Sequence, residues 1–227
     1  MMEYELITAQ SRFDGVIFAD GDTPAHPIPL GILRTNRPVI ACDNAGMKLI
    51  ETLHVMPEAI VGDCDSMSPD FRARHKALIH YVAEQDYNDL TKATRYLVTH
   101  HLSPASTPKR VCYIGCTGKR EDHTLGNISL PVFYRQQFGL DSVMATDFGW
   151  FVYAHGACQF ACFPNQQVSI INLNCTRLES QGLQWQTYAF AQWWQGTVNN
   201  ALGQAFSLDG DGDYIVYRTY EAKKQNL

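Results

Sequence analysis

The sequence predicts an α/β N-terminal domain with a mostly parallel, Rossmann-like sheet, followed by an all-β sandwich C-terminal domain. Up to about residue 148, short apolar runs alternate with segments of helical spacing, as expected of parallel βαβ units. From Gly149 onward the helical period is lost, and short apolar runs bounded by Gly, Asn and Pro follow one another. We therefore expect two closely packed domains, 1–148 and 149–227.

The first half supplies six predicted strands, at 16–19, 38–42, 59–61, 78–82, 111–114 and 142–145. The loop after the first predicted strand, 16–19, contains three prolines that exclude a regular helix there: Pro24, Pro27 and Pro29. Helices are expected after Asn44, which can cap one, from Pro69, after Asp89 and from about His123.

Acidic residues follow the strand ends in this half. They are Asp20, Asp43, Asp63, Asp65 and Asp86. In open parallel sheets, ligands bind outside the carboxyl ends of the strands, so these side chains are expected at one edge.

The pair Asp63 and Asp65 follows the third strand directly, with Cys64 between them expected to point into the core. Two carboxylates this close repel one another until a divalent cation neutralises them, and oxygen ligands suit Mg²⁺. The alternative is an Asp-rich turn closed by an Asx hydrogen bond.

A glycine-containing loop, 115–120, joins the fifth strand to the next helix. Its backbone N–H groups and the helix dipole favour an anion. Lys119 and Arg120 add cations suited to polyphosphate. It is not a Walker loop, because no Gly-Lys-Ser/Thr closes it.

The second half is rich in large aromatic residues, which are expected to fill the core: Trp185, Tyr188, Phe190, Trp193 and Trp194. Segment 209–213 alternates Asp and Gly like the start of an EF-hand loop. Because position twelve of that frame is Tyr220, a hairpin turn is the better interpretation.

The composition of the 227-residue chain argues against some classes of partner. A formal net charge of -5 and the absence of any Lys/Arg block argue against nucleic acid. No signal-like start and no apolar window of about 18 residues is present, so we expect no membrane association and a cytoplasmic location. The seven cysteines are expected to be buried free thiols.

Four ordered motifs, at 43–46, 62–66, 85–89 and 118–127, resemble those of the thiamine pyrophosphokinase family. Segments 182–185 and 196–199 resemble two further motifs of that family, so the likeness covers nearly the whole chain. The resemblance implies transfer of diphosphate from ATP to the hydroxyl of thiamine. It also implies an Mg-ATP-binding catalytic first domain and a second domain that binds thiamine and forms a homodimer.

The resemblance assigns roles residue by residue. The catalytic acidic group is Asp63, Asp65, Asp86 and Asp89, and the Mg²⁺ ligands are Asp63, Asp65 and Asp89. The ATP- and phosphate-binding residues are Asp43, Asn44, Lys119, Arg120, Asp122, His123 and Asn127. The thiamine-binding residues are Gln85, Trp185 and Asn199. Either Asp86 or Asp89 is expected to accept the proton of the thiamine hydroxyl. Either Trp185 or Trp193 is expected to face the cationic thiazolium ring of thiamine.

The chain departs from the family pattern at four of these motif positions: Asn44, Asn88, Lys119 and Val198. The two asparagines keep helix-capping ability, whereas Val198 replaces a serine near the thiamine pocket and is left out of the predicted site. Two other functions stay open from the residues: an Mg²⁺-dependent phosphohydrolase and a catalytically silent nucleotide-binding protein.

Overall fold

The computed structural model describes residues 1–103 and 108–223, and the chain forms two compact units. One unit is Thr8–Asp147, and the other combines Met1–Ile7 with Phe148–Leu227. The sequence assigned residues 1–7 to the first domain. In the structure, β1 (Met2–Tyr4) instead pairs in parallel with β8 (Gly149–Ala161).

The first unit contains a parallel six-stranded sheet in the order β7-β6-β2-β3-β4-β5. Its strands are β2 (Gly15–Phe18), β3 (Val39–Cys42), β4 (Ala59–Gly62), β5 (Ile79–Tyr81), β6 (Arg110–Ile114) and β7 (Asp141–Ala145). All six coincide with predicted strands, and the α/β class is confirmed. The chain moves outward from β2 in one direction and then crosses back to β6, which places a topological switch point between β2 and β6.

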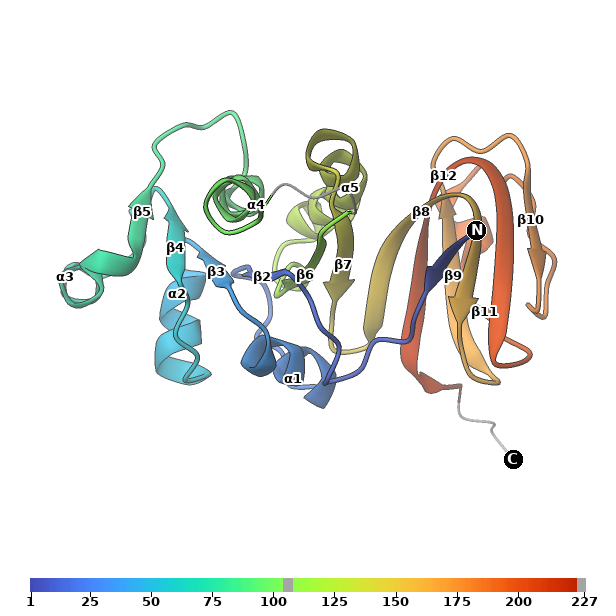
Figure 1. Cartoon of the computed structure of the whole chain (residues 1–227), viewed down its shortest axis with the longest axis horizontal. Helices are drawn as coiled ribbons and strands as arrows, with labels where there is room; N and C mark the ends of the chain where they lie inside the picture. Colours follow the sequence, from blue (N-terminus) through green and yellow to red (C-terminus); the bar gives the residue numbers. More distant parts are fainter. Residues whose placement is uncertain (104–107, 224–227) are drawn as a thin grey trace. The chain divides into compact units, whose positions relative to one another are not determined.

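Helices cover both faces of this sheet, with α4 and α5 on one face and α1 and α2 on the other (Figure 1). They are α1 (Pro27–Thr35), α2 (Ala45–Met47) continued by a π-helical segment (Lys48–Thr52), α3 (Pro69–Arg74), α4 (Asp89–His100) and α5 (Glu121–Phe138). The side chain of Asn88 caps α4 by accepting from the Thr91 N–H at 3.0 Å. Leu90, Ala93 and Leu97 of α4 are buried against the sheet, as their spacing predicts.

The prediction that prolines exclude a helix after β2 is wrong. Pro27 and Pro29 both lie in the first turn of α1, where a missing N–H costs no hydrogen bond and the fixed φ suits a helix. The His26 side chain caps this turn by accepting from Ile28.

Two other helices show local irregularities, and the first differs from expectation. Asn44 precedes α2, but its side chain makes no capping hydrogen bond, because its backbone is already helical. Within α5, the apolar Leu125 is 54% exposed, and the helix continues through a buried Pro131.

The second unit is antiparallel apart from β1, which confirms a β-rich second half. Its long strands β8 and β12 (Ala205–Ala222) pair with each other, and β12 also pairs with β9 (Gln166–Asn172) and β10 (Leu178–Gln181). A short β11 (Asn199–Asn200) extends the β9 edge. The sandwich part of the prediction is not confirmed, because the pairing links these strands in one hydrogen-bonded network.

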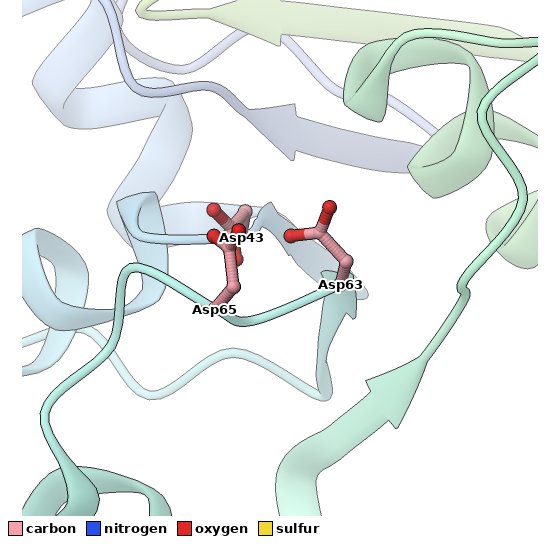
Figure 2. Close-up of side chains that lie close together, drawn as sticks. All are labelled: Asp43, Asp63 and Asp65. Atoms are coloured by element: carbon pink, nitrogen blue, oxygen red, sulfur yellow. The ribbon is translucent and has the colours of Figure 1, made fainter.

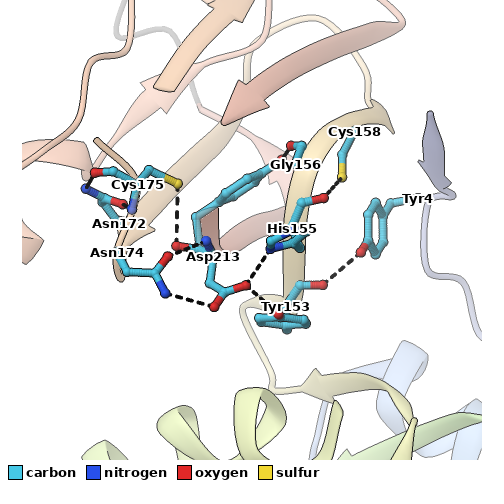
Figure 3. A network of polar contacts seen from close by, with 10 residues as sticks. Tyr4, Tyr153, His155, Gly156, Cys158, Asn172, Asn174, Cys175 and Asp213 are labelled. Atoms are coloured by element: carbon cyan, nitrogen blue, oxygen red, sulfur yellow. Dashed lines mark hydrogen bonds and ion pairs between the residues drawn. The ribbon is translucent and has the colours of Figure 1, made fainter. Parts of the chain in front are cut away.

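Segment 209–213 is not a hairpin turn. It lies inside β12, where the register with β8 shifts between Asp209 and Asp213 and forms a bulge. Figure 3 shows how the bulge is held: the Asp213 carboxylate accepts from Tyr153 at 2.6 Å and from Asn174 at 2.9 Å, and contacts His155 Nδ1 at 2.7 Å. The Asp213 carboxylate is thus used to hold a strand irregularity.

The expected aromatic core of the second unit is largely wrong. Only Phe190 of the five aromatic residues is buried; Trp185 is 50% exposed and Trp194 is 72% exposed, and Tyr188 and Trp193 are exposed as well. The core is built instead from strand residues such as Trp150, Phe160 and Phe206. All seven cysteines are free and buried, as predicted. Among the described residues, no helix is both long and apolar enough to cross a membrane.

Candidate active site

A cavity of about 500 Å³ opens in the first unit beyond the carboxyl ends of the parallel strands. Nine of the residues predicted from sequence line it: Asp43, Asn44, Asp63, Gln85, Asp89, Lys119, Arg120, His123 and Asn127. They come from the segments after β3, β4, β5 and β6, which the parallel topology brings to one edge. Asp65, Asp86 and Asp122 do not line the cavity.

Three carboxylates gather at the edge of the cavity, two of which, Asp43 and Asp63, line it. Asp43, Asp63 and Asp65 each place one oxygen atom so that the three atoms lie within 4.8 Å of one another (Figure 2). The backbone turns sharply to allow this, since Asp43 and Cys64 both have positive φ. Gly62 is required here, because a Cβ on it would lie 2.9 Å from the Asp43 Cβ. Cys64 is buried between Asp63 and Asp65, as predicted.

Asp43 is a partly buried carboxylate whose neighbours include other negative charges. Burial raises its pKa; hydrogen bonds from Ser66 and the Asn44 backbone oppose that rise, and the charges of Asp89 and Asp63 add to it. One oxygen accepts from Ser66 at 2.9 Å, while the other, Oδ1, is buried and has no hydrogen-bond partner among the described residues. Three converging carboxylates with an unsatisfied oxygen fit a hard divalent cation such as Mg²⁺.

The segment before α4 closes a second side of the cavity. Asp89, predicted as a metal ligand, is outside the three-carboxylate cluster and pairs with the nearly buried Lys92 at 3.3 Å. Gln85 donates to Asp63 at 3.2 Å, so it holds that carboxylate in place. Asp86 is exposed and does not line the cavity.

The loop after β6 forms the basic side of the cavity. Its backbone is joined to the loop after β2: Gly21 N–H donates to Gly115 O at 2.7 Å and Asp22 N–H to Thr117 O at 2.9 Å. Beyond the loop, Asn127 donates to Cys116 O at 2.8 Å from the first turns of α5. The pairing of β2 and β6 is therefore continued past the strand ends, which fixes the position of Lys119.

Arg120 and Asp122 contact each other at the start of α5. The guanidinium makes a bidentate pair with the carboxylate, at 3.1 and 2.6 Å. Both side chains are exposed, and the hydrogen bonds of this pair raise the pKa of Arg120 and lower that of Asp122. Asp122 thus orients Arg120, while Arg120 and His123 line the cavity.

Because the two loops are in backbone contact, Gly21→Ala should be strongly disruptive. A Cβ on Gly21 would lie 2.3 Å from Thr117 O and 2.4 Å from Gly115 O, so the loops must separate. We expect the free energy of unfolding to fall by about 2–3 kcal/mol. Gly126→Ala is the matched control, since a Cβ there has no neighbour within 4 Å and a helical alanine should stabilise by about 0.5–1 kcal/mol. Urea unfolding of both variants measures the difference; equal effects would contradict this account of the loops.

Two lysines and one aspartate near the cavity were not predicted as site residues. Asp20 lines the cavity and pairs with both Lys48 and Lys119, and Lys92 lines it beside Asp89. Asp20 was recognisable as an acidic strand end, but Lys48 lies in a helical segment whose position depends on tertiary packing.

The remaining predicted residues, Trp185 and Asn199, lie in the second unit. The Asn199 side chain is buried and bonds both polar groups of the Trp185 backbone, accepting at 3.1 Å and donating at 2.7 Å. It therefore holds in place a tryptophan whose ring is half exposed.

A parallel sheet whose carboxyl edge brings together three carboxylates and a basic glycine loop defines a phosphate-handling α/β enzyme. Family models identify which: residues 32–140 match "Thiamin pyrophosphokinase, catalytic domain" and residues 149–217 match "Thiamin pyrophosphokinase, substrate-binding domain". The chain belongs to the thiamin pyrophosphokinase family and is therefore an ATP-dependent diphosphotransferase. A search of curated proteins finds no match.

Solved structures show the same fold over nearly the whole chain. The yeast thiamin pyrophosphokinase matches with a TM-score of 0.80 at 14% identity, covering 96% of this chain and 90% of its own. The Candida albicans enzyme gives 0.78 at 15% identity, covering 97% and 93%. The Bacillus subtilis enzyme gives 0.72 at 19% identity, covering 93% and 100%.

Proposed function

We propose that this chain is a thiamine diphosphokinase that transfers diphosphate from ATP to the thiamine hydroxyl in the cavity of its first unit. The observation that carries this proposal is that one cavity at the carboxyl edge of the sheet is lined both by two members of the three-carboxylate cluster, Asp43 and Asp63, and by a basic loop. Membership of the thiamin pyrophosphokinase family supports the substrate and the reaction.

Asp43, Asp63 and Asp65 are the proposed Mg²⁺ ligands, with Asp89 beside them in the cavity wall. When bound, Mg²⁺ neutralises polyphosphate charge and so favours attack by an oxygen nucleophile. Gln85 holds Asp63 by its hydrogen bond, and Ser66 holds Asp43.

The basic side is proposed to bind the polyphosphate. Lys119 and Arg120 bring cations to the cavity, and Asp122 orients Arg120 through its bidentate pair. Asn44, His123 and Asn127 line the same cavity and are proposed nucleotide contacts. Positioning and charge neutralisation of this kind supply most of the catalysis that phosphoryl-type transfer needs.

In the proposed reaction, the thiamine hydroxyl oxygen attacks the β-phosphorus of ATP. A bond forms between that oxygen and the β-phosphorus, the bond from the β-phosphorus to the α-bridging oxygen breaks, and AMP leaves. The hydroxyl proton goes to a carboxylate, for which Asp86 and Asp89 are the candidates. The position of Asp89 in the cavity wall supports Asp89 for this role.

The second unit is proposed to bind thiamine and to form a homodimer. Exposed apolar side chains support this: Trp185, Tyr188, Trp193, Trp194, Val198 and Leu202. The ring of Trp185 or Trp193 is proposed to face the thiazolium cation, with Asn199 fixing the Trp185 backbone. Sedimentation should give a species of twice the 25.6 kDa chain mass. A cytoplasmic location stays a prediction from the sequence.

Incubation with ATP, Mg²⁺ and thiamine tests the reaction. We expect thiamine diphosphate and AMP to appear in equal amounts, with no product when thiamine or the metal is left out. ADP or phosphate as the only nucleotide-derived product would instead indicate a hydrolase. ATP binding without turnover would indicate a silent nucleotide-binding protein.

A further inference from the structure

Asp20 occupies a central position that the motifs do not account for. It follows β2 at the switch point between β2 and β6, and its carboxylate contacts two ammonium groups. Lys48 Nζ lies 2.7 Å from Asp20 Oδ1, and Lys119 Nζ lies 2.9 Å from Asp20 Oδ2. Lys48 comes from the segment after α2 and Lys119 from the loop after β6, so three distant parts of the chain meet here.

The two lysines are held differently. Lys48 also donates to Gly21 O at 2.7 Å, and its side chain is 23% exposed. The Lys119 side chain is 50% exposed and has Asp20 as its ion-pair partner among the described residues. Lys48 is therefore the more firmly held cation, whereas the half-exposed Lys119 can exchange its ion pair with Asp20 for one with another anion.

Lys119 also sits in an unfavourable backbone conformation. Its φ is +56°, in the left-handed region where glycine is preferred and where a lysine is strained. The backbone contacts between the loops after β2 and β6 hold it there. The lysine side chain is therefore presented to the cavity at a point where glycine would be the easier residue.

The three charged groups stabilise one another in their ionised forms. Burial disfavours the ionised form of Asp20, but hydrogen bonds from Lys48 and Lys119 outweigh this and lower its pKa. The hydrogen bond to Asp20 in turn raises the pKa of Lys119. One carboxylate faces two ammonium groups, and the negative charge of Asp22 also acts on Lys119.

We propose that Asp20 is a positioning residue that holds Lys119 ready for the polyphosphate of the substrate, while Lys48 keeps Asp20 paired after Lys119 turns to the phosphate. This inference rests on the proposed function, because it assigns the phosphate-binding role of Lys119. It adds two residues, Asp20 and Lys48, to the functional residues of the site. The ligand chemistry is a polyphosphate chain.

Steady-state kinetics of a double-mutant cycle test the inference. Lys119→Met should raise the KM for ATP by about 10- to 100-fold, because a charge-assisted hydrogen bond is lost, with a smaller change in kcat. Asp20→Asn should raise the KM for ATP by about 5- to 10-fold. The double variant should be no worse than Lys119→Met alone, since Asp20 acts through Lys119. Multiplying effects in the double variant would overturn the proposal.

Lys48→Met provides a second, independent test, because in its background the effect of Asp20→Asn on the KM for ATP should change sign. Without Lys48, only Lys119 balances Asp20, so Lys119 is held back and the KM for ATP should rise. Adding Asp20→Asn to Lys48→Met should then lower the KM. A structural role for Asp20 predicts further damage instead, and that result would also overturn the proposal.

Calorimetric titration with inorganic tripolyphosphate separates this inference from the proposed function. Its affinity should fall in Lys119→Met and follow the same cycle, even if the protein makes no thiamine diphosphate. Lys109→Met is the matched control, since Lys109 pairs with Asp14 at 3.4 Å and does not line the cavity. Wild-type affinity in Lys119→Met would contradict the inference while leaving the reaction itself untouched.

Discussion

Asp63→Asn is expected to reduce turnover by about 10²- to 10³-fold while leaving the fold at least as stable as the wild type. The loss of activity follows because Asp63 is a proposed ligand of the metal that would neutralise transition-state charge, and the substitution replaces its carboxylate by a neutral amide. The stability is retained because Asp63 lies close to Asp43 and Asp65, and removing one charge relieves their mutual repulsion. Thiamine diphosphate formation and thermal unfolding of the metal-free protein measure the two effects.

Asp70→Asn is the control for Asp63→Asn. Asp70 is an exposed aspartate that pairs with Arg74 on the same helix and lies outside the cavity. It should change neither activity nor stability appreciably. An Asp63→Asn protein that unfolds at a clearly lower temperature would show instead that the acidic segment is a structural turn.

Arg218→Ala is expected to cost about 3–5 kcal/mol of the free energy of unfolding, the largest stability effect that we predict for a single side chain. Arg218 is fully buried in the second unit, where its guanidinium donates to Tyr4 O at 3.3 Å, Ala161 O at 2.6 Å and Glu5 O at 3.1 Å. It also lies 4.8 Å from the centre of the Trp150 ring. Burial lowers its pKa to about 9, so it stays charged at neutral pH.

A comparison of substitutions separates the two contributions of Arg218. Arg218→Met fills much of the volume without donors, so it should lose less stability than Arg218→Ala and still lose the hydrogen bonds to the carbonyls of Tyr4, Glu5 and Ala161. Arg177→Ala, an exposed arginine of the same unit paired with Asp209, should leave the urea midpoint nearly unchanged. A wild-type midpoint for Arg218→Ala would contradict this role in holding the N-terminal strand.

The edge of the parallel sheet was predictable because each βαβ unit brings its strand end to the same side. That rule alone predicts that Asp43, Asp63 and the loop with Lys119 gather at one edge, and all three line the cavity. It could not decide which carboxylates come within a few ångströms of one another. Asp43 joins Asp63 and Asp65, while Asp89 pairs with Lys92 instead, and the positions of the clustered carboxylates depend on the backbone turns at Asp43 and Cys64.

Other features depended on context that a linear pattern does not carry. The run of prolines predicts a helix break, although Pro27 and Pro29 lie in the first turn of α1, where they are tolerated. The tryptophans were assigned to the core by their apolar area, yet Trp185 and Trp194 are exposed because the long strands β8 and β12 already fill the second unit. The ion pairs of Asp20 needed tertiary structure, since Lys48 and Lys119 are far apart in sequence.

The fate of the two terminal phosphorus atoms of ATP tests the central claim most directly. With ATP labelled at both the β- and γ-phosphorus, incubation with thiamine and Mg²⁺ should place both labels in thiamine diphosphate and leave unlabelled AMP. Label from the γ-phosphorus alone in the thiamine product, or both labels only in inorganic phosphate, would contradict diphosphate transfer at this site.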